Sequence, residues 1–203
     1  MRHKIYSNYL NPTLKRFLVV FFVLIGVLLA ACQNEEDRNK EEKFYFDLKS
    51  FIENQIVYLN DKRPIVTKIV GLDRKTVSNK SKDIDWKKEL ELFVQADLNK
   101  PSYRSSYIVE RKDSATYEYT LKANVELPVR YLKIVTDTNL HQPIYVKARF
   151  QSVNKIYKSE KTIELACSKK NNLLELTSYA VNGYQKLIFM DRKAFDIKAN
   201  IGF

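Results

Sequence analysis

Apolar side chains recur every three or four residues in two segments of the chain, which is the spacing of an amphipathic helix. The first segment carries them at Phe44, Leu48, Phe51, Ile52 and Leu59. It predicts a helix over residues 43–60, because Pro64 disfavours helical geometry in the residue before it. The second segment carries them at Trp86, Leu90, Phe93, Val94 and Leu98. It predicts a helix over residues 85–99, capped by Asp83 or Asp85.

A period of two replaces the helical period in most of the remaining chain. Residues 65–80 contain a β-branched run, a turn after Gly71 and a return segment, which together predict a β-hairpin. From Tyr103 onward, apolar and polar side chains alternate in about seven segments, as expected for antiparallel strands with one buried face. We expect an α+β fold. Two N-terminal helices with a β-hairpin between them would pack on the concave face of a curved antiparallel meander of about seven strands.

The N-terminal segment has a third pattern. Lys15-Arg16 precedes an apolar run from Phe17 to Ala31 that contains no charged side chain, and the next residue is Cys32. This run is shorter than the roughly 20 residues that an ordinary transmembrane helix needs. A basic start, an apolar centre and small residues at the end are typical of a secretory signal.

The end of this run, Leu29-Ala30-Ala31-Cys32, resembles the lipobox of bacterial lipoproteins. The resemblance implies that residues 1–31 are a signal peptide cut before Cys32. It also implies that the Cys32 thiol receives a diacylglyceryl group and that the new amino terminus is acylated, with palmitate as a typical chain. Two or more acyl chains hold a domain stably on a bilayer. Two alternatives stay open: an uncut signal anchor, and a soluble secreted protein cut elsewhere.

A polar and acidic stretch follows the cysteine, consisting of Gln33, Asn34, Glu35, Glu36 and Asp37. It is similar to the lipoprotein export signal of Bacteroidota, which implies the outer face of the outer membrane. Gln33 also differs from the aspartate that retains enterobacterial lipoproteins in the inner membrane. We therefore expect a lipid-anchored outer-membrane protein, at the cell surface in preference to the periplasmic face. Residues 32–43 would form an acidic tether and residues 44–203 a single domain. The alternative is that the acids only keep the tether solvated.

Charge, cysteine and histidine content and the absent motifs limit the ligands and reactions to be expected. The formal net charge is +11 for the full sequence and about +9 without the expected leader and tether. A basic domain favours anionic lipid headgroups or acidic glycans as partners, and the alternative is an ordinary lysine-rich solvated surface. An exported protein is not expected to bind nucleic acid. Acylation of Cys32 would leave Cys167 without a disulfide partner, as a small apolar strand residue. His141 is the one histidine beyond the leader, and it falls in a predicted turn. Zinc, phosphate-loop and nucleophile motifs are absent, so we expect no catalytic residue, no metal ion and no cofactor.

Aromatic and basic side chains share strand faces and form one candidate binding surface. Tyr131 and Lys133 are two residues apart, and Tyr145, Lys147 and Arg149 follow the same spacing of two. Flat rings beside cations suit sugars and lipid headgroups. The alternative is the ordinary exposed face of a sheet, on which tyrosine and lysine are common.

The expected architecture is loosely similar to that of the LolA and LolB carriers, which shield acyl chains between a sheet and its helices. No motif residue carries this similarity. The first hypothesis is a non-catalytic, lipid-anchored binding or envelope-assembly component, whose protein partner the sequence does not identify. The alternative is a LolB-like carrier of lipid or lipoprotein acyl chains. A hydrolase whose site has no sequence signature is a third hypothesis.

Overall fold

The computed structural model describes residues 43–73, 75–170 and 173–203. The predicted leader, Cys32 and the five residues from Gln33 to Asp37 lie outside these residues. The chain from Lys43 to Phe203 forms one compact unit. In the part of the chain that the structure describes, no helix is long and apolar enough to cross a membrane.

The unit is built from short helices and long strands. In chain order they are α2 (Leu48–Lys62), β1 (Ile65–Leu72), β2 (Lys75–Ser81), α3 (Trp86–Glu89), α4 (Glu91–Gln95), the 3-10 helix η1 (Pro101–Tyr103), β3 (Tyr107–Arg111), β4 (Thr116–Leu121), β5 (Val129–Thr136), β6 (Pro143–Val153), β7 (Tyr157–Lys170), β8 (Leu173–Leu187) and β9 (Lys193–Gly202).

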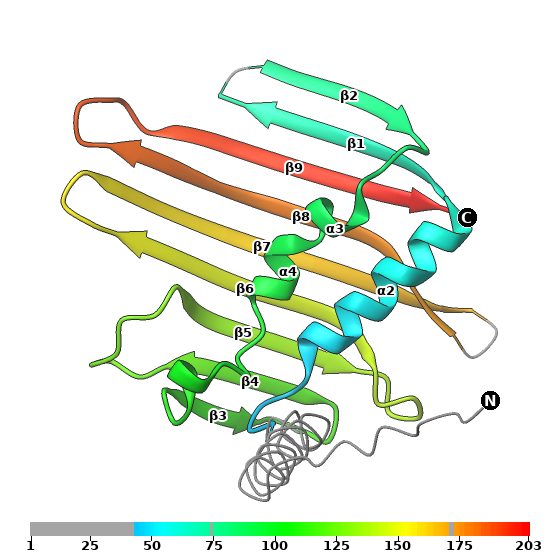
Figure 1. Cartoon of the computed structure of the whole chain (residues 1–203), viewed down its shortest axis with the longest axis horizontal. Coiled ribbons are helices and arrows are strands. Elements are labelled where there is room, and N and C mark those ends of the chain that lie inside the picture. Colours follow the sequence, from blue (N-terminus) through cyan, green and yellow to red (C-terminus); the bar gives the residue numbers. More distant parts are fainter. Residues whose placement is uncertain (1–42, 74, 171–172) are drawn as a thin grey trace, which may run out of the picture. The chain divides into compact units, whose positions relative to one another are not determined.

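All nine strands belong to one antiparallel sheet with the order β2-β1-β9-β8-β7-β6-β5-β4-β3, and the sheet is open rather than closed into a barrel. Helices α2, α3 and α4 lie over one face of it (Figure 1). We call the opposite face, which carries Glu118, Lys133, Lys147 and Glu164, the open face. The α+β class and a meander of seven strands, β3 to β9, are therefore confirmed. The curvature expected for the sheet stays a prediction.

The predicted hairpin is present as β1 and β2, but it has a second role that the sequence pattern does not reveal. Strand β1 pairs with β9 along its whole length, from Ile65 opposite Gly202 to Leu72 opposite Phe195. The hairpin thus extends the meander to nine strands instead of lying apart from it. Alternation of side chains defines the two faces of a strand, but it does not identify the strand's neighbours.

The predicted helix over residues 85–99 is wrong in its extent, because the structure has two short helices there. Leu90, with φ −98° and ψ 8°, separates α3 from α4. The side chain of Asp85 caps α3 by accepting a hydrogen bond from the backbone N–H of Lys88, at 3.2 Å. Trp86 and Phe93 are buried against the sheet, so the apolar face was predicted correctly although the helix was not.

A buried carboxylate joins the end of α4 to the beginning of α2. Asp97 is 4% exposed, and its Oδ1 accepts hydrogen bonds from the backbone N–H groups of Leu48 (3.1 Å) and Lys49 (3.2 Å). Its Oδ2 accepts a third, from the backbone N–H of Asn99 at 2.9 Å. The first N–H groups of a helix have no partner within the helix, and a negative charge suits the positive end of the helix dipole. Asp97 therefore holds the two helical segments together.

The middle of α2 is hydrogen-bonded to the sheet through Gln55. Strand β9 pairs with β8 only from Ser178 onward, so residues 173–177 of β8 have no strand on that side. The buried Gln55 side chain fills this gap: its Nε2 donates to the carbonyl of Leu174 at 3.0 Å, and its Oε1 accepts from the N–H of Leu176 at 3.2 Å. One side-chain amide thus satisfies two backbone groups that a neighbouring strand would otherwise bond.

We expect the substitution Gln55→Leu to lower the free energy of unfolding by about 2–4 kcal/mol, because two buried backbone groups lose their partners. The carbonyl of Leu174 and the N–H of Leu176 would then be unsatisfied. Chemical denaturation measures the effect. The matched control is Glu53→Gln, an exposed position on the same helix, which should change the free energy by less than about 0.5 kcal/mol. Equal stability of the two variants would contradict this role of Gln55.

Candidate binding cavity on the open face

The predicted binding residues are brought together on the open face, on the neighbouring strands β5 and β6. They are Tyr131, Lys133, Tyr145, Lys147 and Arg149. The cross-strand register places Tyr131 directly opposite Arg149. It places Lys133 directly opposite Lys147. Residues two apart on a strand share a face, which is why the pattern alone could group them.

Two of the three cations in this group are paired with acids from the flanking strands. Lys133 lies 3.0 Å from a carboxylate oxygen of Glu118 on β4, and Lys147 lies 2.8 Å from one of Glu164 on β7. The register aligns the four residues in one row across β4, β5, β6 and β7. Opposite charges at facing positions stabilise a sheet. These two lysines are therefore part of a charge ladder and are poorly placed to hold a free anion.

The two tyrosines flank this ladder and are half-buried. Burial raises the pKa of both Tyr131 and Tyr145, and the nearby carboxylates of Glu118 and Glu164 raise them further. Both hydroxyl groups are therefore protonated at neutral pH and can donate hydrogen bonds.

Arg149 has a different environment. Its side chain is exposed, and among the residues that the structure describes it makes no hydrogen bond and no ion pair. It borders a cavity of about 480 Å³ that opens on this face. The other residues that line the cavity are Thr120, Leu121, Lys122, Ala123, Arg130, Gln151 and Glu160.

Arg130 reaches the cavity because of a β-bulge. The pairing of β5 with β6 passes from Val129, opposite Phe150, directly to Tyr131, so Arg130 is an extra residue without a partner position. Its Nη1 donates to the carbonyl of Val125 at 3.3 Å. Its Nε is buried and has no hydrogen-bond partner within residues 43–73, 75–170 and 173–203. A buried N–H without a partner is costly, so this guanidinium has a donor that no described group satisfies.

The cavity therefore combines three cationic side chains with one carboxylate. Lys122 Nζ donates to the carbonyl of Ser105 at 2.6 Å, while Arg149 is free to turn toward a ligand. The fork of N–H groups on a guanidinium matches the oxygens of a phosphate or a carboxylate. This arrangement can hold one anionic group of a larger molecule.

Sequence reasoning missed Lys122 and Arg130. Lys122 continues the alternation of Glu118 and Thr120, so its place on the open face could have been found from the pattern. Arg130 could not, because only the bulge brings its side chain to the same cavity as Arg149.

The other candidate residues are placed as follows. His141 is exposed in the turn between β5 and β6, with a φ of 53°, as predicted. Cys167 is half-buried on β7 against the core, and burial raises the pKa of its thiol to about 12, so it stays uncharged. Within the described residues, no group of three or more histidine, cysteine, aspartate or glutamate side chains is placed to hold a metal ion.

Glu89, the last residue of α3, contacts the sheet. Its carboxylate accepts hydrogen bonds from Lys68 on β1 and from the hydroxyl of Tyr179 on β8, each at 2.5 Å. This side chain therefore joins α3 to strands β1 and β8. Burial raises the pKa of Tyr179, and the bond to Glu89 adds to the shift.

The charge ladder predicts a pH dependence. The hydrogen bond to Lys133 holds the pKa of Glu118 below its ordinary value of 4.5. A lowered pKa in the folded state means that the stabilisation is present above the unfolded-state value and is lost as the pH falls through the folded-state value. We expect Glu118→Gln to lower the free energy of unfolding by about 1 kcal/mol at pH 7. The difference from the unsubstituted protein should shrink steadily below about pH 4.

Denaturant titrations at several pH values measure this difference. The control is Glu126→Gln in the exposed β4–β5 connection, which should show no pH-dependent difference. A constant difference between Glu118→Gln and the unsubstituted protein at all pH values would refute the electrostatic role of Glu118.

Comparison with known proteins adds no assignment to this geometry. No family model matches the chain, and neither a curated protein nor a solved structure matches it. A function for the protein therefore has to be argued from the open-face cavity and from the residues of the chain themselves.

Proposed function

We propose that the protein is a non-catalytic binding component of the bacterial cell envelope, anchored to the outer membrane through acylated Cys32. Its open-face cavity would take an anionic group of the ligand. The observation that carries the proposal is the pair Arg130 and Arg149, two guanidinium groups on one cavity of about 480 Å³, each with unused donors. Anionic lipid headgroups and acidic glycans share the phosphate or carboxylate chemistry that such groups bind.

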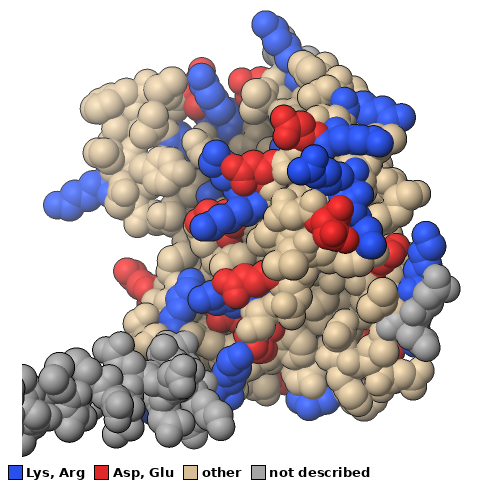
Figure 2. Space-filling model, turned by 45° about the vertical axis from the view of Figure 1, so that its right-hand side comes forward, with Lys and Arg blue, Asp and Glu red and all other residues tan. Residues whose placement is uncertain are grey.

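The lining supports binding in preference to catalysis. Guanidinium, ammonium and amide groups from Arg149, Lys122 and Gln151 can hold an anion without reacting with it. Lysine, arginine and acidic side chains are interspersed on the side of the molecule that Figure 2 shows. This mixture supports a local anion site more than a broad basic surface.

The alternative function, a carrier of acyl chains, would need an apolar cavity between the helices and the sheet. The side chains that meet there are closely packed: Leu48, Ile52, Leu59 and Phe93 from the helical layer are 0% exposed. A cavity of about 470 Å³ near the end of α2 is lined by Asn60, Arg63, Lys82 and Asp83 as well as by apolar residues. Dense packing and a charged rim support the binding proposal over the carrier.

The anchor is tested by changing the cysteine. We expect Cys32→Ser to abolish incorporation of radiolabelled fatty acid and to leave an unprocessed precursor, because no thiol remains to be acylated. The control is Cys167→Ser, which should be labelled and processed normally. Gel mobility and fatty-acid labelling in cells measure both properties. Normal processing of the Cys32→Ser variant would refute the proposed anchor.

The cavity is tested with two soluble anionic probes, inorganic pyrophosphate and a heparin oligosaccharide. We expect Arg149→Gln to weaken the binding of at least one probe by about tenfold, because a charge-assisted hydrogen bond contributes about 1.5–3 kcal/mol. Isothermal titration calorimetry measures the affinity. The control is Lys80→Gln, an exposed cation on β2, which should change the affinity less than about twofold. Equal binding by the Arg149→Gln variant and the unsubstituted protein would remove the cavity from the proposal.

A further inference from the structure

One end of the sheet exposes a cluster of large apolar side chains on the β6–β7 and β8–β9 turns. We call this cluster the apolar tip, and it consists of Val153, Ile156, Leu187, Ile188, Phe189 and Met190. Phe189 is 93% exposed, and Ile156 is 62% exposed. A cluster of exposed apolar side chains of this kind marks a site of interaction, whereas single exposed apolar residues elsewhere on a surface are ordinary.

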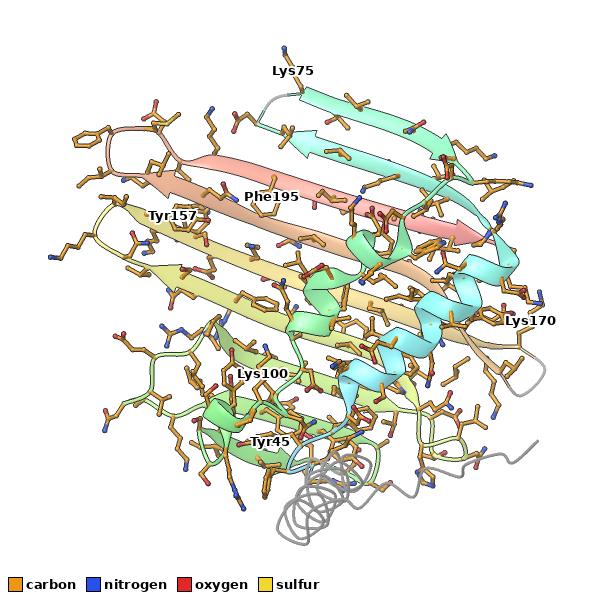
Figure 3. All side chains as sticks on the ribbon, in the orientation of Figure 1. Tyr45, Lys75, Lys100, Tyr157, Lys170 and Phe195 are labelled. Carbon is orange, nitrogen blue, oxygen red and sulfur yellow. The ribbon has the colours of Figure 1, made fainter. Side chains whose placement is uncertain are left out.

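The two turns form one surface. The backbone N–H of Ile188 in the β8–β9 turn donates to the carbonyl of Ile156 in the β6–β7 turn, at 3.0 Å. Tyr157 lies opposite Leu187 in the β7–β8 register. Both turns extend from the same end of the sheet (Figure 1), and the labelled side chain of Tyr157 lies toward that end (Figure 3).

Positive charge surrounds the apolar tip. The cations in and beside the two turns are Lys155, Lys158, Lys186, Arg192 and Lys193, and the one acid among residues 153–158 and 186–193 is Asp191. None of the four lysines makes a hydrogen bond or an ion pair with a residue that the structure describes. The guanidinium of Arg192 stacks on the ring of Tyr184, at 3.7 Å from its centroid.

Lys158 and Lys186 face each other directly across β7 and β8. Like charges at facing positions destabilise a sheet. On the same face, the row of Glu118, Lys133, Lys147 and Glu164 shows how this sheet neutralises lysines elsewhere. The uncompensated pair at the tip is therefore suited to a negative surface outside the protein.

We propose that the apolar tip docks on an anionic lipid bilayer. Apolar side chains flanked by cations suit the bilayer interface. The apolar side chains enter the outer part of the acyl-chain region, and the cations stay among the lipid phosphates. A second copy of this chain would bring the same cations against each other, which disfavours self-association at the tip. This contact does not depend on acylation at Cys32 or on the anion cavity. It would orient the domain with the β6–β7 and β8–β9 turns toward the membrane.

The test uses the full chain reconstituted into vesicles, with a photo-cross-linking residue as a local probe. Phe189→p-benzoylphenylalanine places the probe on the tip. The control, Leu173→p-benzoylphenylalanine, places it at the opposite end of β8, on another exposed apolar residue. In vesicles of phosphatidylcholine with phosphatidylglycerol, we expect at least about fivefold more lipid cross-linking at position 189 than at position 173. Unchanged thermal midpoints establish that both variants are folded.

A charge variant tests the role of the cations. Substituting Lys155, Lys158 and Lys186 together with glutamine should reduce lipid cross-linking at position 189 about tenfold in the anionic vesicles. It should have little effect in phosphatidylcholine alone. Equal cross-linking at positions 189 and 173, indifference to phosphatidylglycerol, or a cross-linked dimer of this chain would each overturn the proposal.

Discussion

The helical layer depends on one buried carboxylate. Strands β2 and β3 are the two edges of the sheet, so the segment between them has to cross the whole helical face. Asp97 lies within this crossing and binds the first N–H groups of α2, which have no partner inside the helix. Asp97 is buried, and a buried carboxylate is costly unless it is hydrogen-bonded. Breaking this contact would therefore leave a buried charge without its partners. Through this contact, α2 and the crossing segment cover the sheet as one layer.

Helices α2, α3 and α4 all lie on one face of the sheet (Figure 1), and the other face carries polar side chains. These polar side chains occur in two arrangements. In the middle, facing charges neutralise each other, as Lys147 and Glu164 do. Toward the β6–β7 and β8–β9 turns, cations such as Arg149 and Lys158 have no acid opposite them. The cavity and the apolar tip both lie toward this end of the sheet. Glu160, which lines the cavity, is two residues from Lys158 on β7.

Much of the fold and part of the candidate site could be predicted from local pattern. A period of two correctly placed Tyr131, Lys133 and Arg149 on one face, because successive side chains of a strand alternate. The pattern missed Arg130, since a bulge depends on how two strands are aligned and not on either strand alone. It also predicted one helix where the structure has two, because the spacing of apolar residues does not reveal the change of backbone geometry at Leu90.

The sequence by itself determined the class of the fold, the buried face of each element and the charge of the exposed faces. These properties follow from the spacing of side chains within one element, and they need no partner. Only the tertiary structure decided that β1 joins β9, that Glu118 neutralises Lys133, and that Arg130 meets Arg149. These contacts join different elements through backbone hydrogen bonds, an ion pair or a shared cavity, and they depend on strand registers that arise only when the whole sheet assembles.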